Sequence, residues 1–263
     1  MTEETPGALY EVRGNVALIT LNRPEAMNSV NRALSTGLGE GLERADQDPT
    51  VRVVVLTATG RAFCAGMDLK AFAAGEDVSA AGHPEWGFAG MVRHPISKPV
   101  IAAVNGFAMG GGTELVLAAD LAVAAESAKF GLPEVKRGLV AAAGGVLRLP
   151  RQIPVRKAME LALTGRAVTA QEAADLGLVN RVVDDEALLE AAFELAAEIA
   201  ANAPLAVQAT KRMIHEQARF GSDLDDEIWQ HHDEVLLPVF RTADAMEGAV
   251  AFAEKRTPVW KGE

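Results

Sequence analysis

Apolar positions follow two different periods along the chain, and each period predicts one kind of element. Residues 10–13 and 16–21 are typical of the two strands of a hairpin, because a Gly-Asn dipeptide that readily adopts positive φ separates them. Leucines recur every four residues across 31–45, which is the spacing of an amphipathic helix with one buried face. The chain therefore begins with a hairpin followed by a helix.

Three further segments are almost continuously apolar. They cover residues 51–58, 100–104 and 121–125. Such segments are typical of strands in a parallel sheet whose two faces are both covered. Glycine-rich turns at 60–66 and 106–112 follow the first two. Because strands alternate with helical stretches, the pattern predicts right-handed βαβ units and an α/β fold.

Helical patterns dominate the second half of the chain. A capping-box sequence at 169–172 opens a helix that Gly177 is placed to end, and apolar residues recur with helical spacing across 188–199. Pro204 begins a further helix, so the last third forms a helical layer. Residues 74–90 mix Gly, Asp, Ser, His and Pro without a period, and we expect a mobile loop beside the functional site.

Composition and charge exclude several classes of protein. The 263 residues include one cysteine, Cys64, so the chain has no intrachain disulfide and no Cys-x-x-Cys site. The net charge of −11 repels polyanions, and we expect no nucleic-acid partner. Polar residues and glycines interrupt the most apolar stretch, 100–125, so we expect no membrane span. Residues 1–6 are acidic and polar, unlike a secretory signal, which favours the cytoplasm.

Several familiar site motifs are missing from the sequence. It contains no GxGxxG, GxxxxGK[S/T], HExxH or GxSxG pattern, so dinucleotide, P-loop, zincin and α/β-hydrolase sites lack their residues. The five histidines do not recur at the spacing of metal ligands. We therefore expect no metal site.

The most informative stretch for chemistry is the glycine run 110–112, which Glu114 follows. Glycines that leave a buried strand allow close backbone approach and leave free N–H groups at the start of the next helix, as in an oxyanion hole. An apolar run follows Glu114, so we expect burial to raise the pKa of its carboxyl group. The alternative is a first-turn carboxylate that only complements the helix dipole.

Two further segments carry candidate groups. Pro133 fixes the chain just before Glu134, which is either a surface-turn carboxylate or, if the fold brings it to Glu114, one of two carboxylates that hold a water molecule. Residues 60–70 place another glycine turn after an apolar strand and offer a second backbone donor. Cys64 lies between apolar residues of this segment, and we interpret it as an inert buried thiol.

Together these motifs resemble those of the crotonase family, the enoyl-CoA hydratases and isomerases. The resemblance covers nearly the whole chain. It is carried by residues 22–25 (NRPE) with Asn28, 63–69 (FCAGMDL), 98–106 (KPVIAAVNG), 110–114 (GGGTE), 130–134 (FGLPE), 164–166 (TGR), 173–180 (AADLGLVN) and 251–256 (AFAEKR).

The resemblance implies a fold and an assembly. Members of this family fold as a spiral of ββα units with a C-terminal helical region. It implies that residues 1–200 form the spiral core and that residues 201–263 form the helical region that builds a homotrimer or a dimer of trimers. The implied partner is an acyl-CoA thioester substrate, which brings its own coenzyme A, so no separate cofactor is expected.

The resemblance also implies roles for individual residues. The backbone N–H groups of Met67 and Gly111 would hold the thioester oxygen, and Glu114 would activate water for syn addition across the C2=C3 bond while Glu134 moves the C2 proton. The presence of both carboxylates favours a hydratase over an isomerase. The residues implied to contact coenzyme A or substrate are Ala26, Ala65, Asp68, Leu69, Lys70, Gly110, Phe252 and Lys255, the last two often from a neighbouring subunit.

Within the family, four segments look most like those of carnitinyl-CoA dehydratases, which hydrate crotonobetainyl-CoA. They are residues 68–76, 87–90, 144–150 and 254–262. A trimethylammonium group favours aromatic surroundings, for which Trp86 and Phe88 are candidates. Ala141 and Ala142 depart from the family pattern, which bears on the preference for the acyl group.

A function of another class is a CoA-thioester-binding or RNA-binding relative of the crotonases without hydratase activity. Both glutamates and the glycine run argue against an inactive relative, and the net charge of −11 argues against RNA. Binding of an acyl-CoA without turnover of any enoyl-CoA would identify such a protein.

Overall fold

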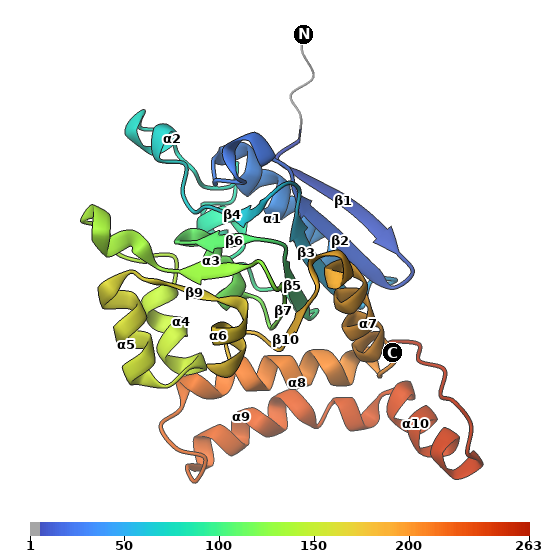
Figure 1. The fold of residues 1–263 in the computed structure, drawn as a ribbon. Helices are drawn as coiled ribbons and strands as arrows, with labels where there is room; N and C mark the ends of the chain where they lie inside the picture. Colours follow the sequence, from blue (N-terminus) through green and yellow to red (C-terminus); the bar gives the residue numbers. More distant parts are fainter. Residues whose placement is uncertain (1–5) are drawn as a thin grey trace.

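The main sheet of the computed structural model has six strands in the order β1-β2-β3-β5-β7-β10 (Figure 1). The structure describes residues 6–263, so the prediction drawn from residues 1–6 falls almost entirely outside the described part. β1 and β2 form the expected antiparallel hairpin, and the other neighbouring strands pair in parallel. The strands are β1 (Ala8–Arg13), β2 (Val16–Leu21), β3 (Val53–Ala58), β5 (Val100–Val104), β7 (Leu121–Ala125) and β10 (Arg181–Val183).

A second sheet has four strands of three residues each, in the order β4-β6-β8-β9. The sequence predicts only turns where β4 and β6 lie, because a strand of this length shows no period. Each of β3, β5 and β7 leads into a short strand of the second sheet and then a helix, which confirms the α/β spiral of ββα units. The short strands are β4 (Ala62–Cys64), β6 (Phe107–Met109), β8 (Lys129–Gly131) and β9 (Ala167–Thr169).

The helices begin and end close to the predicted positions. The side chain of Asn31 accepts a hydrogen bond from the Leu34 amide at 3.0 Å, and Thr169 caps its helix through the Glu172 amide, as the capping box predicts. The helices are α1 (Arg32–Gln47), α2 (Leu69–Ala73), α3 (Gly111–Ala118), α4 (Gly145–Gln152), α5 (Val155–Thr164), α6 (Ala170–Asp175), α7 (Leu188–Ala200), α8 (Pro204–Glu216), α9 (Asp226–Leu236) and α10 (Ala243–Glu254).

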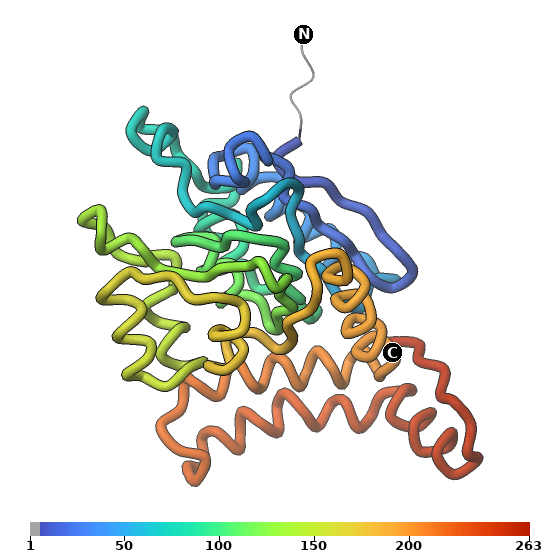
Figure 2. The backbone as a smooth tube through the Cα atoms, viewed as in Figure 1, coloured from blue at the N-terminus to red at the C-terminus, as the bar shows by residue number. Residues whose placement is uncertain are grey.

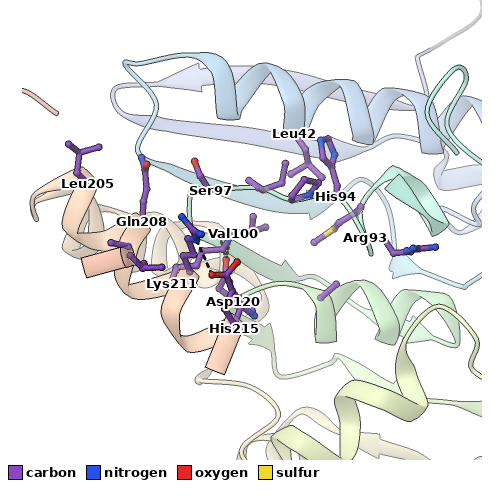
Figure 3. Close-up of a pocket in the computed structure, with 18 of the residues that line it drawn as sticks. Leu42, Arg93, His94, Ser97, Val100, Asp120, Leu205, Gln208, Lys211 and His215 are labelled. Atoms are coloured by element: carbon purple, nitrogen blue, oxygen red, sulfur yellow. Dashed lines mark hydrogen bonds and ion pairs between the residues drawn. The ribbon is translucent and has the colours of Figure 1, made fainter. Parts of the chain in front are cut away.

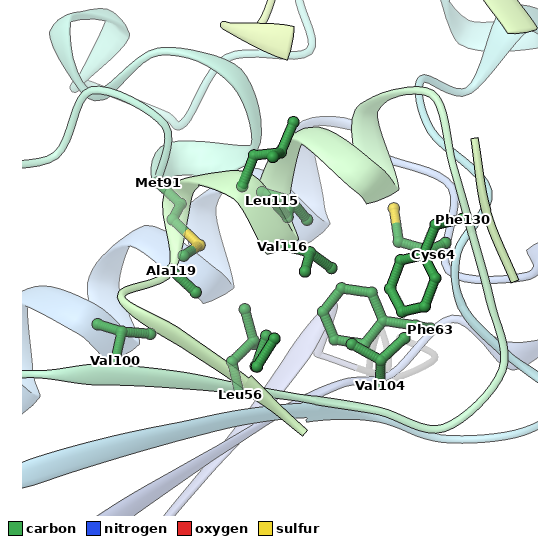
Figure 4. Close-up of a cluster of buried hydrophobic side chains, with 14 of the residues drawn as sticks. Leu56, Phe63, Cys64, Met91, Val100, Val104, Leu115, Val116, Ala119 and Phe130 are labelled. Carbon is green, nitrogen blue, oxygen red and sulfur yellow. The ribbon is translucent and has the colours of Figure 1, made fainter. Parts of the chain in front are cut away.

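Different helices cover the two faces of the main sheet. Along β3, Val53 and Val55 belong to the core packed against α7, whereas Val54 and Leu56 face the larger core that contains α1 and α3. Figure 4 shows this larger core, with Leu56 from the sheet and Leu115 from α3 directed into one interior. Helix α3 is therefore almost completely buried, and a polar side chain in its first turn has little access to water.

The C-terminal helices α8, α9 and α10 form a layer on one side of the spiral core (Figure 1). The chain path in Figure 2 then returns toward the end of α7, where the Trp260 indole N–H donates to the Ala201 carbonyl oxygen at 2.7 Å. Among residues 6–263, no helix is both long and apolar enough to cross a membrane.

Asp120, directly before β7, attaches α8 to the core. Its carboxylate lies 2.7 Å from Lys211 Nζ and 2.8 Å from His215 Nε2, and it accepts the Val100 amide at 2.8 Å. Lys211 also donates to the Lys98 carbonyl oxygen. Figure 3 shows Lys211 and His215 directed from α8 toward Asp120, at the wall of a cavity of about 860 Å³. Burial alone would raise the pKa of Asp120, but its bonds to His215 and Lys211 hold that pKa below the usual range.

The substitution Asp120→Asn is expected to lower the free energy of unfolding by about 3 kcal/mol at pH 7, because it leaves Lys211 without its charge partner. A carboxyl group with a depressed pKa in the folded state stabilises above the ordinary Asp pKa of about 3.9 and loses that contribution below it. The difference from wild type, measured by urea unfolding, should therefore shrink as the pH falls below about 4. Asp175→Asn, at an exposed position on α6, is the control. Equal stabilities at pH 7 would contradict the role of Asp120.

Candidate active site

The glycine run occupies the sharp turn between β6 and α3. Gly110 has φ of +56°, in the region that favours glycine, and its amide donates to the Gly131 carbonyl oxygen at 2.8 Å. The Thr113 hydroxyl donates to the Ala108 carbonyl oxygen at 2.6 Å and accepts from the Gly131 amide at 3.0 Å. Gly111 then begins α3. The N-terminus of the helix is thus held rigidly against the second sheet.

The segment after β4 packs directly on this turn, as the sequence predicts for a second backbone donor. Gly66 has φ of +93°, and a Cβ atom placed on it would lie 3.2 Å from the Gly111 nitrogen. The Val30 amide donates to the Gly66 carbonyl oxygen, and the Val30 carbonyl oxygen accepts from the Asp68 amide. Val30 thus bonds to the residues on both sides of Met67. Within residues 6–263, the amides of Met67 and Gly111 donate no hydrogen bond. Two unused backbone donors therefore lie on adjoining segments.

Glu114 lies in the first turn of α3 and is 3% exposed. Its Oε1 accepts a hydrogen bond from the Gly145 amide at 2.8 Å. Burial raises the pKa of Glu114 to about 7, the negative charge of Glu134 adds to the rise, and the Gly145 amide and Arg148 oppose it. Burial thus has the effect that the sequence predicts. Gly145 is a partner that the sequence does not reveal, since its only signal is a Gly-Gly pair.

Glu134 comes from the 3-10 turn η4 (Pro133–Arg137), which Pro133 begins. A Cβ atom on Gly110 would lie 3.0 Å from Oε1 of Glu134, so the carboxylate lies over the turn before α3. Its Oε2 is buried without a hydrogen-bond partner among the described residues, and burial raises the pKa of Glu134. The alternative of an exposed turn glutamate does not fit this environment. The fold brings the two carboxylates and the two free amides together.

The two aromatic candidates of the segment 74–90 lie in different places. Phe88 is at the site, because a Cβ atom on Gly111 would collide with its ring. Trp86 is not: it is buried, stacks between His83 and His94 at ring distances of 3.9 and 4.1 Å, and packs against α1. The prediction of Trp86 as a site residue is therefore wrong. The segment also contains two 3-10 turns, η2 (Pro84–Trp86) and η3 (Phe88–Gly90), where the sequence shows no period.

Most of the residues that the resemblance assigns to coenzyme A lie together. The Ala65 amide donates to the Met27 carbonyl oxygen at 3.0 Å, which joins the segment 65–70 to η1 (Pro24–Ala26) with Ala26 at its end. Asp68 caps α2 and pairs with Arg23 at 3.3 Å. Leu69 and Lys70, which the resemblance also assigns to coenzyme A, begin α2 and are exposed.

Phe252 and Lys255 are not brought to this site by their own chain. Both lie at the end of α10, which Figure 1 shows on the other side of the molecule from α2. Phe252 is 87% exposed. These two positions can meet the segment 65–70 only if a second copy of the chain supplies them.

Cys64 is buried, and the histidines form no cluster of metal ligands among the described residues. Burial raises the pKa of the Cys64 thiol to about 12, which disfavours the reactive thiolate, in line with the interpretation of a buried, unreactive thiol. In the part of the chain that the structure describes, no group of three or more His, Cys, Asp or Glu side chains is arranged to hold a metal ion.

Replacing Glu134 with Gln should lower the pKa of Glu114, because it removes the neighbouring negative charge that raises this pKa. Infrared spectroscopy of the carboxyl stretch in the substrate-free protein, with Glu114→Gln as the reference, measures the titration. We expect a midpoint at about 7 in the wild type. A wild-type midpoint near the ordinary glutamate value of about 4.3 would contradict the burial of Glu114.

Comparison with known proteins identifies the family of the chain. The profile of the family described as enoyl-CoA hydratase/isomerase matches residues 11–263. Carnitinyl-CoA dehydratase of Proteus mirabilis is 44% identical over 95% of this chain and 96% of its own. A probable enoyl-CoA hydratase/isomerase of Mycobacterium abscessus (54% identity, TM-score 0.91) and enoyl-CoA hydratase of Mycobacterium tuberculosis (50%, 0.93) each match over 98% of this chain and 100% of their own. The chain therefore belongs to the enoyl-CoA hydratase/isomerase family of enzymes, the crotonases.

Proposed function

We propose that the protein is a hydro-lyase that adds water reversibly to the C2=C3 double bond of a 2-enoyl-CoA thioester. The observation that carries this proposal is the pair of buried carboxyl groups, Glu114 and Glu134, beside two unused backbone amides. A carboxyl group whose pKa is near neutrality is suited to exchange protons with water. The coenzyme A is part of the substrate, and the proposed reaction needs no other cofactor.

The amides of Met67 and Gly111 stabilise the charge that develops on the thioester oxygen. When water adds at C3, the electrons of the double bond move toward this oxygen and an enolate forms. Amides fixed by Thr113 and Val30 need no reorganisation to donate hydrogen bonds to it. One such donor typically contributes about 3–4 kcal/mol to the transition state.

The two carboxyl groups divide the proton transfers. Glu114, oriented by the Gly145 amide, takes a proton from water as the water oxygen bonds to C3. Glu134 gives a proton to C2, and the product is the 3-hydroxyacyl-CoA. In the reverse direction Glu134 removes the C2 proton and Glu114 protonates the leaving hydroxyl group. Both groups exchange protons in either direction, in keeping with their raised pKa values.

A carnitinyl-CoA dehydratase is the second candidate within the same reaction class. Relatives of that name are 44% identical to this chain in Proteus mirabilis and 53% identical in Mycobacterium avium. The Phe88 ring against Gly111 offers one aromatic face near the acyl group, and such a face attracts a trimethylammonium cation. With Trp86 turned away, it is a single face rather than an aromatic cage.

Self-association as a homotrimer or a dimer of trimers would complete the coenzyme A site. Large apolar side chains on the C-terminal helices and the turn between them are left exposed, including Phe240 (77%), Met246 (68%) and Phe252 (87%). An exposed apolar surface on neighbouring elements favours a protein interface. A neighbouring α10 that covered it would bring Phe252 and Lys255 to the phosphates of coenzyme A.

Glu114→Gln and Glu134→Gln should each lower kcat for hydration by about 10²- to 10⁴-fold, because each removes one general acid–base group. Loss of the enoyl-thioester absorbance with crotonyl-CoA and with crotonobetainyl-CoA measures the reaction. Glu190→Gln, at an exposed position of α7, should match the wild type.

Faster hydration of crotonobetainyl-CoA than of crotonyl-CoA would support the carnitinyl-CoA dehydratase. Variants as active as the wild type would contradict the two-carboxylate mechanism. A wild type that binds an acyl-CoA and hydrates no enoyl-CoA would identify a binding protein of the crotonase fold.

Lys255→Ala should raise KM for the thioester about tenfold, which corresponds to ~1.4 kcal/mol for one charged contact to phosphate, and should leave kcat unchanged. The effect should diminish as salt screens the contact. Steady-state kinetics at low and high salt measure both quantities, and Lys261→Ala is the control. An unchanged KM at low salt would contradict a role for Lys255 in binding coenzyme A.

A further inference from the structure

Arg148, on α4, ties together two segments next to Glu114. Its guanidinium donates to the Val92 carbonyl oxygen at 2.5 Å and to the Ala143 carbonyl oxygen at 3.3 Å. Val92 follows the turn that carries Phe88, and Ala143 immediately precedes the Gly144–Gly145 pair. One side chain thus links the segment after η3 to the start of α4.

The guanidinium also shapes the turn that holds Glu114. Gly144 has φ of +105°, and a Cβ atom on it would collide with Nη1 of Arg148. The next residue, Gly145, donates to Glu114 Oε1, and a Cβ atom there would lie 3.0 Å from the same oxygen. Arg148 therefore packs on one glycine of the pair, and Glu114 packs on the other. The position of the Gly145 amide depends on both contacts.

Few charges reach Glu114. Among the described residues, the charged side chains that act on its carboxyl group are Glu134 from η4 and Arg148 from α4. Arg151, one turn further along α4, faces Arg148 and is exposed. Arg148 is therefore the positive charge of this environment, and Glu134 is the negative one.

We propose that Arg148 is a positioning residue that holds the 143–145 turn in the arrangement that orients Glu114. Its positive charge also favours the ionised form of Glu114. Its part in catalysis rests on the proposed hydration; its effect on Glu114 does not. The planar fork of arginine reaches two carbonyl oxygens from separate segments at once, which the single ammonium group of lysine does less well. The position therefore requires arginine geometry as well as positive charge.

The test compares Arg148→Met, Arg148→Lys and the matched control Arg151→Met. The first readout needs no substrate: the titration of Glu114 by infrared spectroscopy, each variant being referenced to the same variant carrying Glu114→Gln. Arg148→Met should move the midpoint of Glu114 to higher pH, because a nearby positive charge favours the carboxylate. Arg148→Lys should keep the midpoint, and Arg151→Met should match the wild type.

The second readout is the pH profile of kcat with crotonyl-CoA. Glu114 must be ionised to accept a proton from water. The acidic limb of the kcat profile should therefore move to higher pH in Arg148→Met. Arg148→Lys should leave the acidic limb of the profile unchanged. It should lower kcat about tenfold, because an ammonium group holds the two carbonyl oxygens less well than the planar guanidinium does. KM should change less than kcat in Arg148→Met and Arg148→Lys, since neither alters the segment 65–70, and Arg151→Met should keep both.

An unchanged Glu114 midpoint in folded Arg148→Met would overturn the electrostatic part of the proposal. A wild-type kcat in Arg148→Lys would overturn the geometric part. If Arg148→Met does not fold, Arg148→Gln, which keeps two N–H donors and removes the charge, gives the same titration test. If no variant or wild type hydrates any enoyl-CoA, the proposed function fails, while the substrate-free titration still decides the effect of Arg148 on Glu114.

Discussion

The close contact between two backbone segments is the constraint on which the rest of the site depends. A Cβ atom on Gly112 would collide with the Cys64 carbonyl oxygen, and one on Gly106 would collide with the Arg61 carbonyl oxygen. β4 and β6 can pair in parallel at this separation only because glycine occupies these positions. The pairing places the Gly66 turn against the first residue of α3. The two unused amides, of Met67 and Gly111, therefore belong to backbone segments that pack against each other. Their positions do not depend on the rotamer of any side chain of their own.

Burial then determines what the acidic groups can do. Glu114 is attached to a helix whose other side chains form the core, so its carboxyl group is held away from water except at the site. Desolvation makes its charged form costly, and the backbone amides of Gly145 and Ala143, together with the Arg148 guanidinium, offset part of that cost. The result is a carboxyl group that gains or loses a proton near neutral pH. The same burial makes Cys64, one strand away, chemically inert.

Five strands of the main sheet could be predicted from sequence because they are long enough to show a pattern, whereas β10, with three residues, could not. β2, β3, β5 and β7 are continuous apolar runs, and the caps at Asn31 and Thr169 use side chains with a known preference. The second sheet could not be predicted, since three-residue strands carry no period. The pairing of Glu114 with Glu134 came from resemblance, because a separation of twenty residues specifies no contact. The assignment of Trp86 to the site was wrong for a related reason. The sequence around an aromatic residue in a polar segment does not indicate which side chain it will stack on, here His94.

The position of the single cysteine gives the protein an internal reporter of its own opening. Cys64 is fully buried, and its backbone carbonyl lies against Gly112, at the contact between β4 and α3. A thiol reagent can reach its sulfur only when the structure around it opens, so the rate of labelling reports opening of this region. In native-like conditions that rate yields a local free energy of opening. The same residue that contributes nothing to the chemistry thus makes the rigidity of the amide pair a measurable quantity.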